Sequence, residues 1–464
     1  MTTKLDLGLK TSNQKLGAIE WLQARQRGLA VSTSIESSSD DGTGPRPKHR
    51  LTTGLCNDRG RILDNILRKL YRNLSAGPIK DTSFQSGFGS IYNLEFSPDG
   101  RMVVAACERR AMALFDPLTS RTICSVQNAH TDCVNCITFF DSRTFASGSD
   151  DNTIALWDIR NLKSKVRSFQ GHTNWVKSIE YCPASQLMIS SAFDDNVLLW
   201  DINKYDAQTN EPLYDSLLNL ATLMRMRITP DGTKMILSSS SSMYVIIHDL
   251  NLAHLADDME GINNYIHADA TEGRQHAHIF YRKRNRVEIV NDFPNSSPGE
   301  EFSISSLVIH PQGWCMISRL STDNDNVEYT CVHDIQENCA TITLCEEGRE
   351  FFQYHGYNNP LKHERLLYHI NEPSDGKGYI KELSMSPEGH LICSSFGYGV
   401  RLLAFDTGIS ELCDLQPSSP DILHEVKSIF SHRQTVLTSA FSPNQCLLVS
   451  GCLNGRVVFY HPTL

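Results

Sequence analysis

The residues of this chain whose types and spacing could do chemistry are a Cys-x-x-Cys pair and a group of histidines. Cys133 and Cys136 have the spacing of half a zinc site or of a redox pair. The residues around them are apolar and alternate as in a strand, which favours two buried cysteines. His267, His276 and His278 could bind a transition metal, but their intervals fit no compact ligand motif, which favours a solvated loop.

A basic run, Arg282-Lys283-Arg284-Asn285-Arg286, is the third such group. It lies between the apolar segments HIFY and VEIV, which favours a hairpin turn; a nuclear-import signal or a patch for an acidic partner is the alternative. The chain contains no Walker-type glycine loop, no HExxH and no GxSxG motif. The residues therefore predict no catalytic site, no metal and no cofactor, and we expect a protein that is not an enzyme.

The tetrapeptide Trp157-Asp158-Ile159-Arg160 carries the strongest signal for a binding function. It closes the stretch FASGSDDNTIALWDIR, and Trp-Asp is typical of the third strand of a propeller blade. An Arg two places beyond the Asp is unusual there, and Asn203 stands at the corresponding place after the next Trp-Asp. Because the fold does not need this Arg, we expect it to contact a partner. The alternative is a solvated Arg that pairs with Asp158 or a neighbouring acid.

These segments belong to a repeat that dominates the chain after about Ser86. Trp157 and Trp200 are 43 residues apart, and each closes a unit of alternating strands and turns. Weaker copies bring the number to seven. The sequence therefore predicts an all-β fold, a seven-bladed WD-repeat β-propeller with an N-terminal helical extension. The weaker copies are Ser90–Pro117, Leu223–Leu250, Ser303–Asp334, Tyr379–Asp406 and Thr435–Pro462.

In the second and third copies, a His, a Ser, an Asp and a Trp can form one chain of hydrogen bonds that joins three strands. The predicted tetrads are His130, Ser147, Asp151 and Trp157, and His172, Ser191, Asp195 and Trp200.

The ring also needs a strand to close it. The sequence ends just after the third strand of the last copy, so we predict that an earlier segment, Ile79–Gln85, supplies the missing outer strand. Two insertions, near 253–300 and 346–378, interrupt the repeat and are expected to form loops on the propeller.

Residues 1–78 precede the predicted propeller, 79–464. Segment 1–30 contains a helix with a Ser cap and a Gly stop, 31–55 reads as a disordered linker, and 56–78 contains an amphipathic helix over Arg59–Leu74. The apolar stripe of the last helix either packs on the propeller or the first helix, or inserts into a groove of another protein. The stripe consists of Ile62, Leu63, Ile66, Leu67, Leu70, Tyr71 and Leu74.

Composition limits the remaining possibilities. The 464 residues contain no apolar run long enough to span a membrane and no secretory signal, so we expect an intracellular protein of the nucleus, the cytoplasm or both. The 14 cysteines are scattered, as in a reducing compartment. The net charge of −10 argues against nucleic acid as a partner.

The repeats resemble the WD-repeat family, and the stretch ending in Trp157-Asp158-Ile159-Arg160 is similar to the box of substrate receptors of cullin-4 ubiquitin ligases. The chain as a whole, with the helix at Arg59–Leu74, also resembles these receptors. The resemblance implies a protein that docks on the damaged-DNA-binding adaptor of the ligase and presents other proteins, its unknown substrates, for ubiquitination. A general WD-repeat scaffold of another nuclear or cytoplasmic assembly is the alternative.

The resemblance also implies which residues bind the adaptor. Arg160 contacts it, with Trp157 and Asp158 as the rest of the box. Many such receptors carry two boxes in succeeding blades, whereas Asn203 replaces the second Arg here, which shifts more of the docking to the helix. The helix residues expected in the adaptor's cleft are Ile62, Leu63, Ile66, Leu67, Leu70 and Tyr71.

Overall fold

The computed structural model describes helix α2 (Cys56–Arg72) and most of the chain that follows it. The chain divides into two compact units, Met1–Lys69 and Leu70–Leu464. The predicted first helix and the predicted linker lie outside the described residues, and no described helix has the length and apolarity to cross a membrane. The described residues are 56–77, 87–183, 185–205, 212–220, 223–239, 244–252, 255, 278–281, 286–290, 293–294, 302–310, 315–322, 327–336, 365–373, 381–415, 417 and 419–463.

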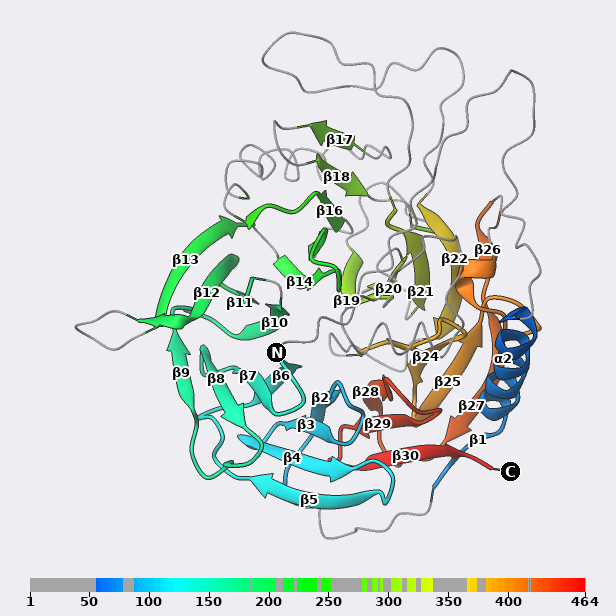
Figure 1. Ribbon diagram of the computed structural model, residues 1–464, viewed down its shortest axis with the longest axis horizontal. Coiled ribbons are helices and arrows are strands. Elements are labelled where there is room, and N and C mark those ends of the chain that lie inside the picture. Colours follow the sequence, from blue (N-terminus) through cyan, green and yellow to red (C-terminus); the bar gives the residue numbers. More distant parts are fainter. Residues whose placement is uncertain are drawn as a thin grey trace, which may run out of the picture. The chain divides into compact units, whose positions relative to one another are not determined.

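The second unit is a ring of seven sheets, so the predicted seven-bladed propeller is confirmed (Figure 1). In four of the blades, successive strands pair antiparallel in chain order from the centre outward. Their strands are β2 (Ile91–Phe96), β3 (Val103–Cys107), β4 (Ala111–Asp116) and β5 (Arg121–Val126) in blade one; β6 (Val134–Phe139), β7 (Thr144–Ser149), β8 (Thr153–Asp158) and β9 (Arg167–Gln170) in blade two; β10 (Val176–Cys182), β11 (Leu187–Ala192), β12 (Asn196–Tyr205) and β13 (Pro212–Asn219) in blade three; and β23 (Ser384–Met385), β24 (Leu391–Phe396), β25 (Gly399–Ala404) and β27 (His424–Phe430) in blade six.

The two predicted insertions supply β17 and β18 of blade four and β22 of blade five, so they do more than form loops; the outermost strand of blade five, β26, comes from later in the chain. The two strands on either side of residues 282–285 pair antiparallel, as the hairpin predicted for the basic run requires. The strands are β14 (Leu223–Ile228), β15 (Met235–Ser239), β16 (Tyr244–His248), β17 (His278–Tyr281) and β18 (Arg286–Val290) in blade four, and β19 (Phe302–Ile309), β20 (Cys315–Thr322), β21 (Val327–Asp334), β22 (Leu366–Pro373) and β26 (Asp421–Ile422) in blade five.

Blade seven closes the ring with a strand from the N-terminal side, but not with the predicted one. Its strands β28 (Val436–Phe441), β29 (Leu448–Cys452) and β30 (Val457–Pro462) are completed by β1 (Leu74–Ala76), which pairs antiparallel with β30. The predicted closing segment, Ile79–Gln85, lies outside the described residues. The chain reaches β30 directly after helix α2, so Leu74, which the sequence placed in the helix, is the first residue of the closing strand.

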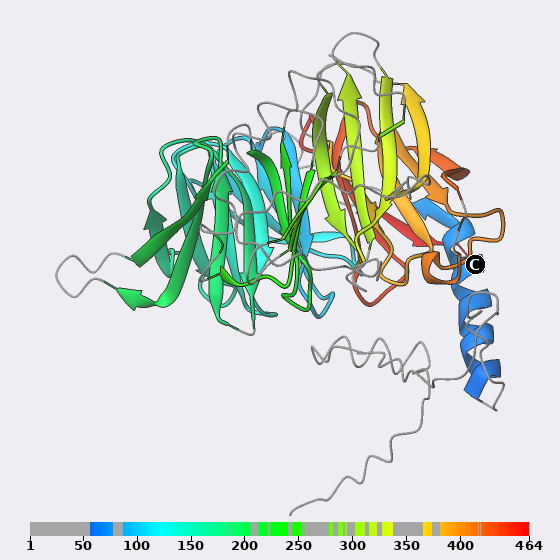
Figure 2. The same ribbon diagram turned by 90° about the horizontal axis from the view of Figure 1, so that it is seen from above.

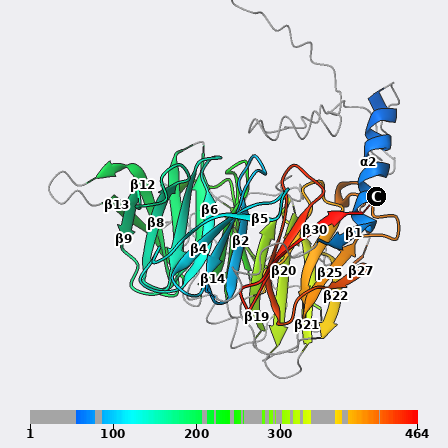
Figure 3. The ribbon, with the colours of Figure 1, turned by 90° about the horizontal axis from the view of Figure 1, so that it is seen from below.

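The strands cross between two faces of the ring, as the side views in Figures 2 and 3 show. Because neighbouring strands of a blade are antiparallel, the turns alternate between these faces. The connection between the third and fourth strands of blade two carries Arg160, whereas the turn between the second and third strands of blade six carries Tyr398. We call the two opposite faces the Arg160 face and the Tyr398 face.

Hydrogen bonds join neighbouring turns along the Tyr398 face. The turn between the second and third strands of a blade bonds to the loop that enters the same blade. Leu453 N donates to Thr435 O at 2.9 Å in blade seven, and the N–H of Val436, the first residue of β28, donates to Gly397 O of blade six at 2.9 Å. The turns of blades six and seven therefore form one continuous surface.

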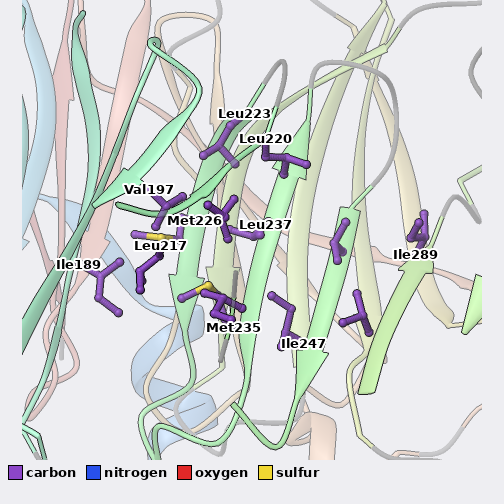
Figure 4. Packing of buried hydrophobic residues seen from close by; sticks show 14 residues of the cluster. Ile189, Val197, Leu217, Leu220, Leu223, Met226, Met235, Leu237, Ile247 and Ile289 are labelled. Carbon is purple, nitrogen blue, oxygen red and sulfur yellow. The ribbon is translucent and has the colours of Figure 1, made fainter. Parts of the chain in front are cut away.

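Burial follows the position of each strand in its blade. The central strands β3 and β4 are buried almost throughout, because a neighbouring blade covers each side, whereas the outer strand β5 alternates between exposed and partly buried residues. Between blades three and four, aliphatic side chains from both sheets pack into one cluster (Figure 4). Burying each such side chain contributes roughly 1.5–3 kcal/mol. The cluster includes Ile189, Val197, Leu217, Leu223, Met226, Met235, Leu237 and Ile247.

Candidate functional site

Blade two contains the predicted tetrad, which fixes the end of β8. Trp157 Nε1 donates to Ser147 Oγ at 2.9 Å, Ser147 Oγ lies 2.8 Å from His130 Nε2, and His130 Nδ1 lies 3.0 Å from Asp151 Oδ2. Burial alone would raise the pKa of Asp151, but hydrogen bonds from His130 and Thr153 hold it below its usual value. Trp157 is only 2% exposed. The prediction that Trp157 contacts the adaptor is therefore wrong: its ring is used inside the blade.

Blade three contains the same tetrad, but two of its predicted members are wrong. His172 lies 2.7 Å from Ser190 Oγ and 3.0 Å from Asp194 Oδ2, and Trp200 Nε1 donates to Ser190 at 2.8 Å. Ser190 and Asp194 thus take the places predicted for Ser191 and Asp195. The reason is that the register is set by the pairing of β11 with β12, where the Ser lies ten residues before the Trp in both blades.

Blade seven contains a variant of the tetrad that the sequence analysis missed. His432 Nε2 lies 2.7 Å from Ser450 Oγ, which lies 2.8 Å from the hydroxyl of Tyr460. Tyr460 takes the place of the Trp, and the signal that could have revealed it is again a Ser ten residues earlier. The place of Asp151 and Asp194 is taken by Asn454.

The carboxylate of Asp158 organises the surface at the end of β8. Arg143 donates through Nε to Asp158 Oδ1 at 3.1 Å and through Nη2 to Oδ2 at 2.6 Å. The backbone N–H of Arg160 donates to Asp158 Oδ1 at 3.0 Å, and its Nη2 lies 3.4 Å from Oδ2. Asp158 is thus mainly engaged by Arg143 and by the backbone.

The side chain of Arg160 is 64% exposed, and its one ion pair among the described residues, with Asp158, is long. The alternative predicted from sequence, an Arg paired with Asp158, is therefore present only as this 3.4 Å contact. A guanidinium has five N–H donors, so most of them remain available on the Arg160 face. In blade three, the backbone N–H of Asn203 donates to Asp201 Oδ1 at 3.0 Å, as that of Arg160 does to Asp158, but Asn203 has no guanidinium to offer a partner.

Helix α2 carries the second set of predicted docking residues. Ile66 is 47% exposed, and Leu63 and Leu67 are partly buried. Arg68 and Asp64 form an ion pair of 2.5 Å one turn apart, which supports the helix locally. The side chain of Ile62 lies outside the described residues.

The last turn of α2 belongs to the propeller unit, together with Leu70. Tyr71 is fully buried, and its hydroxyl donates to Glu388 at 2.6 Å. Burial and the neighbouring Glu388 raise the pKa of Tyr71 well above its usual value. Lys427 Nζ also donates to Leu74 O at 2.8 Å. The prediction that Tyr71 contacts the adaptor is therefore wrong, because this side chain anchors the closing strand.

The residues considered for chemistry lie apart from this surface. Cys136 is buried and Cys133 half-buried, and burial raises the pKa of both thiols to about 11, so neither is a ready thiolate. His267 and His276 lie outside the described residues, and His278 begins β17. Among the residues of the propeller unit that the structure describes, a turn with Glu411, Cys413 and Asp414 brings ligand atoms within 4.8 Å of one another, but acidic groups at a surface turn often do so without a metal.

The sequence was also compared with known proteins. The model of the WD domain, G-beta repeat, matches residues 121–158, 163–201 and 424–461. DDB1- and CUL4-associated factor 10 of Danio rerio is 39% identical over 439 residues, covering 89% of this chain and 82% of that protein. The human protein of the same name is 36% identical and covers 90% and 81%. The chain belongs to the DDB1- and CUL4-associated factor 10 family.

A solved structure supports the fold alone. The Cps50 (Swd1) β-propeller domain of Myceliophteria thermophila matches with a TM-score of 0.53 at 12% identity, covering 81% of this chain and 98% of that domain. In this chain the exposed Arg160 follows β8, between the third and fourth strands of blade two.

Proposed function

We propose that this chain is a substrate receptor of a CUL4 ubiquitin ligase, which docks on DDB1 and presents other proteins for ubiquitination. Its relatives, named for their association with DDB1 and CUL4, are 36–39% identical over most of the chain. The chain acts by binding two proteins at once and contributes no catalytic step of its own.

The observation that carries this proposal is the exposure of Arg160 beside a carboxylate that Arg143 already holds. A planar guanidinium at a strand end can form two parallel hydrogen bonds with a carboxylate or with backbone carbonyls, and arginine is enriched among residues that dominate binding energy. Arg160 therefore supplies the anchor of the docking surface.

Helix α2 supplies the second contact. Its exposed Ile66, with Leu63 and Leu67 on the same stripe, can enter an apolar groove of DDB1. Tyr71 does not take part, because its side chain is fully buried in the propeller unit, whereas the partly exposed Leu70 stays a predicted contact.

Size-exclusion chromatography of the purified chain with DDB1 tests the proposal. We expect one complex that elutes earlier than either protein, and a larger one when CUL4 is added. Separate elution of the chain and DDB1 at micromolar concentrations would contradict it, and would favour a scaffold of another assembly. The variant Leu67→Asp, at a partly buried helix position, should weaken the complex without changing the unfolding temperature of the propeller.

A further inference from the structure

Blade seven has a polar network that lacks its acid. In blades two and three, Asp151 and Asp194 accept a hydrogen bond from the Nδ1–H of the tetrad His. In blade seven this place is held by Asn454, whose side chain is exposed at the turn between β29 and β30. Among the described residues, no acceptor lies within hydrogen-bond distance of His432 Nδ1, although this atom is buried.

A second unsatisfied donor lies in the same turn. Arg456 Nε is buried and has no acceptor among the described residues. Burial, and to a smaller extent the nearby Arg456, lower the pKa of His432 to about 3, so the ring is neutral near physiological pH and carries one N–H. If the Tyr460 hydroxyl donates to Ser450 as the Trp N–H does in blades two and three, Ser450 donates to His432 Nε2 and that N–H is on Nδ1. An imidazole N–H and a guanidinium without a shared acceptor are complementary to a carboxylate.

Exposed apolar side chains surround this turn on the Tyr398 face. Tyr398, Phe430 and Leu453 are 56%, 65% and 48% exposed. Tyr398 and Phe430 are neighbours, because Gly399 pairs with Phe430 in the sheet and His432 N donates to Tyr398 O at 2.9 Å; Leu453 lies on the adjacent turn, where its N–H donates to Thr435 O at 2.9 Å. The exposed Arg433 adds a further positive charge. Three large apolar side chains together on adjacent turns are typical of a binding surface.

We propose that this surface binds an extended segment of a substrate protein in which an acidic side chain is flanked by apolar ones. The acid lies against His432 and Arg456 and takes the part that Asp151 and Asp194 play in their own blades. The apolar side chains pack on Tyr398, Phe430 and Leu453. That the partner is a substrate rests on the proposed function. The surface lies on the face opposite Arg160, so both partners can bind together.

Selection of short random peptides displayed on phage against the whole purified chain tests this proposal. We expect the enriched peptides to share an Asp or Glu next to aromatic or aliphatic residues. A fluorescein-labelled copy of the most enriched peptide is then titrated with the chain. Replacing its acidic residue by the corresponding amide should weaken binding about tenfold. Enrichment of basic or purely polar peptides, or no enrichment over the starting library, would overturn the proposal.

Three variants locate the site with the same peptide. Phe430→Ser should weaken binding about tenfold, whereas Leu118→Ser, equally exposed at 65% but on the Arg160 face, should not. Asn454→Asp places a carboxylate of the chain itself beside His432, so it should raise the unfolding temperature and weaken peptide binding. Unchanged peptide affinity in Asn454→Asp despite a higher unfolding temperature would show that the peptide's acid binds elsewhere.

The affinity of the same variants for DDB1 separates this proposal from the proposed function. If Phe430→Ser and Asn454→Asp bind both DDB1 and the peptide like wild type, the proposed peptide-binding surface is contradicted and the proposed function is not. If the wild-type chain does not bind DDB1, the proposed function is contradicted. The peptide measurements then test the proposed peptide-binding surface independently.

Discussion

Arg143 donates to both carboxylate oxygens of Asp158, with its shortest contact at 2.6 Å, while the guanidinium of Arg160 reaches the same carboxylate only at 3.4 Å. Two guanidinium groups thus compete for one acid, and Arg143 makes the closer contacts. The charge of Arg160 is therefore less compensated within the chain, which is the state that a docking anchor requires.

Removing Arg143 should weaken DDB1 binding indirectly. In Arg143→Ala, Asp158 can turn to Arg160 and hold it, so we expect a loss of affinity of about three- to tenfold in a calorimetric titration. Adding Asp158→Asn should restore most of the affinity, because the amide keeps an oxygen for the backbone of Arg160 but has no charge. If the double variant binds as weakly as Arg143→Ala, Arg143 contacts DDB1 directly instead.

The tetrad of blade three should depend on Ser190 and not on its neighbour. Ser190 joins Trp200 to His172, so Ser190→Ala leaves two buried groups unsatisfied and should lower the free energy of unfolding by about 1–3 kcal/mol. Ser191→Ala is the matched control, since Ser191 is equally buried but lies outside this chain of hydrogen bonds. Chemical denaturation compares the two variants, and an equal loss in both would contradict the observed register.

Closure of the ring should depend on Tyr71 and the short strand β1. In Tyr71→Phe, Glu388 loses a donor at 2.6 Å in a buried place, so the free energy of unfolding should fall by about 1–3 kcal/mol. Tyr398→Phe, at an exposed Tyr, should be neutral. Thermal unfolding of chains starting at Leu70 and at Pro78 extends the test: the first should keep the wild-type midpoint, and the second, without β1, should unfold at a lower temperature.

Stability should fall in mild acid partly because of His432. Its pKa in the folded chain is about 3, below the ordinary 6.5 of the unfolded chain. As the pH falls from 6.5 toward 3, the unfolded chain takes up a proton at this position and the folded chain does not, which favours unfolding by up to about 1.4 kcal/mol per pH unit. The His432→Gln variant should therefore show a shallower decline than wild type between pH 6.5 and about 5. Parallel profiles would show that other groups cause the decline.

The repeat made the propeller predictable, because each blade has its own turns, strands and closing aromatic. The spacing of Trp157 and Trp200 was enough to place blades two and three and the tetrad of blade two. In blade three, however, the His lies one residue further from its Ser than in blade two. The Ser that lies ten residues before Trp200 is Ser190. Because another Ser, Ser191, stands next to it, the prediction named the wrong Ser.

Long-range pairing limited the prediction elsewhere. The closing strand Leu74–Ala76 has three residues, and its partner β30 lies almost 400 residues later, so no local pattern marks it. The amphipathic stripe correctly indicated helix α2 but could not show that the side chain of Tyr71 is buried in the propeller unit. The sequence also could not show that Arg143 forms an ion pair with Asp158, since only the fold brings the two side chains together.

The affinity of purified DDB1 for the Arg160→Ala chain tests the docking account most directly, with Asn203→Ala, the same position of the next blade, as the control. We predict that Arg160→Ala weakens binding by about tenfold or more while Asn203→Ala binds like wild type. Equal affinity of Arg160→Ala and wild type, with both chains folded, would contradict the account.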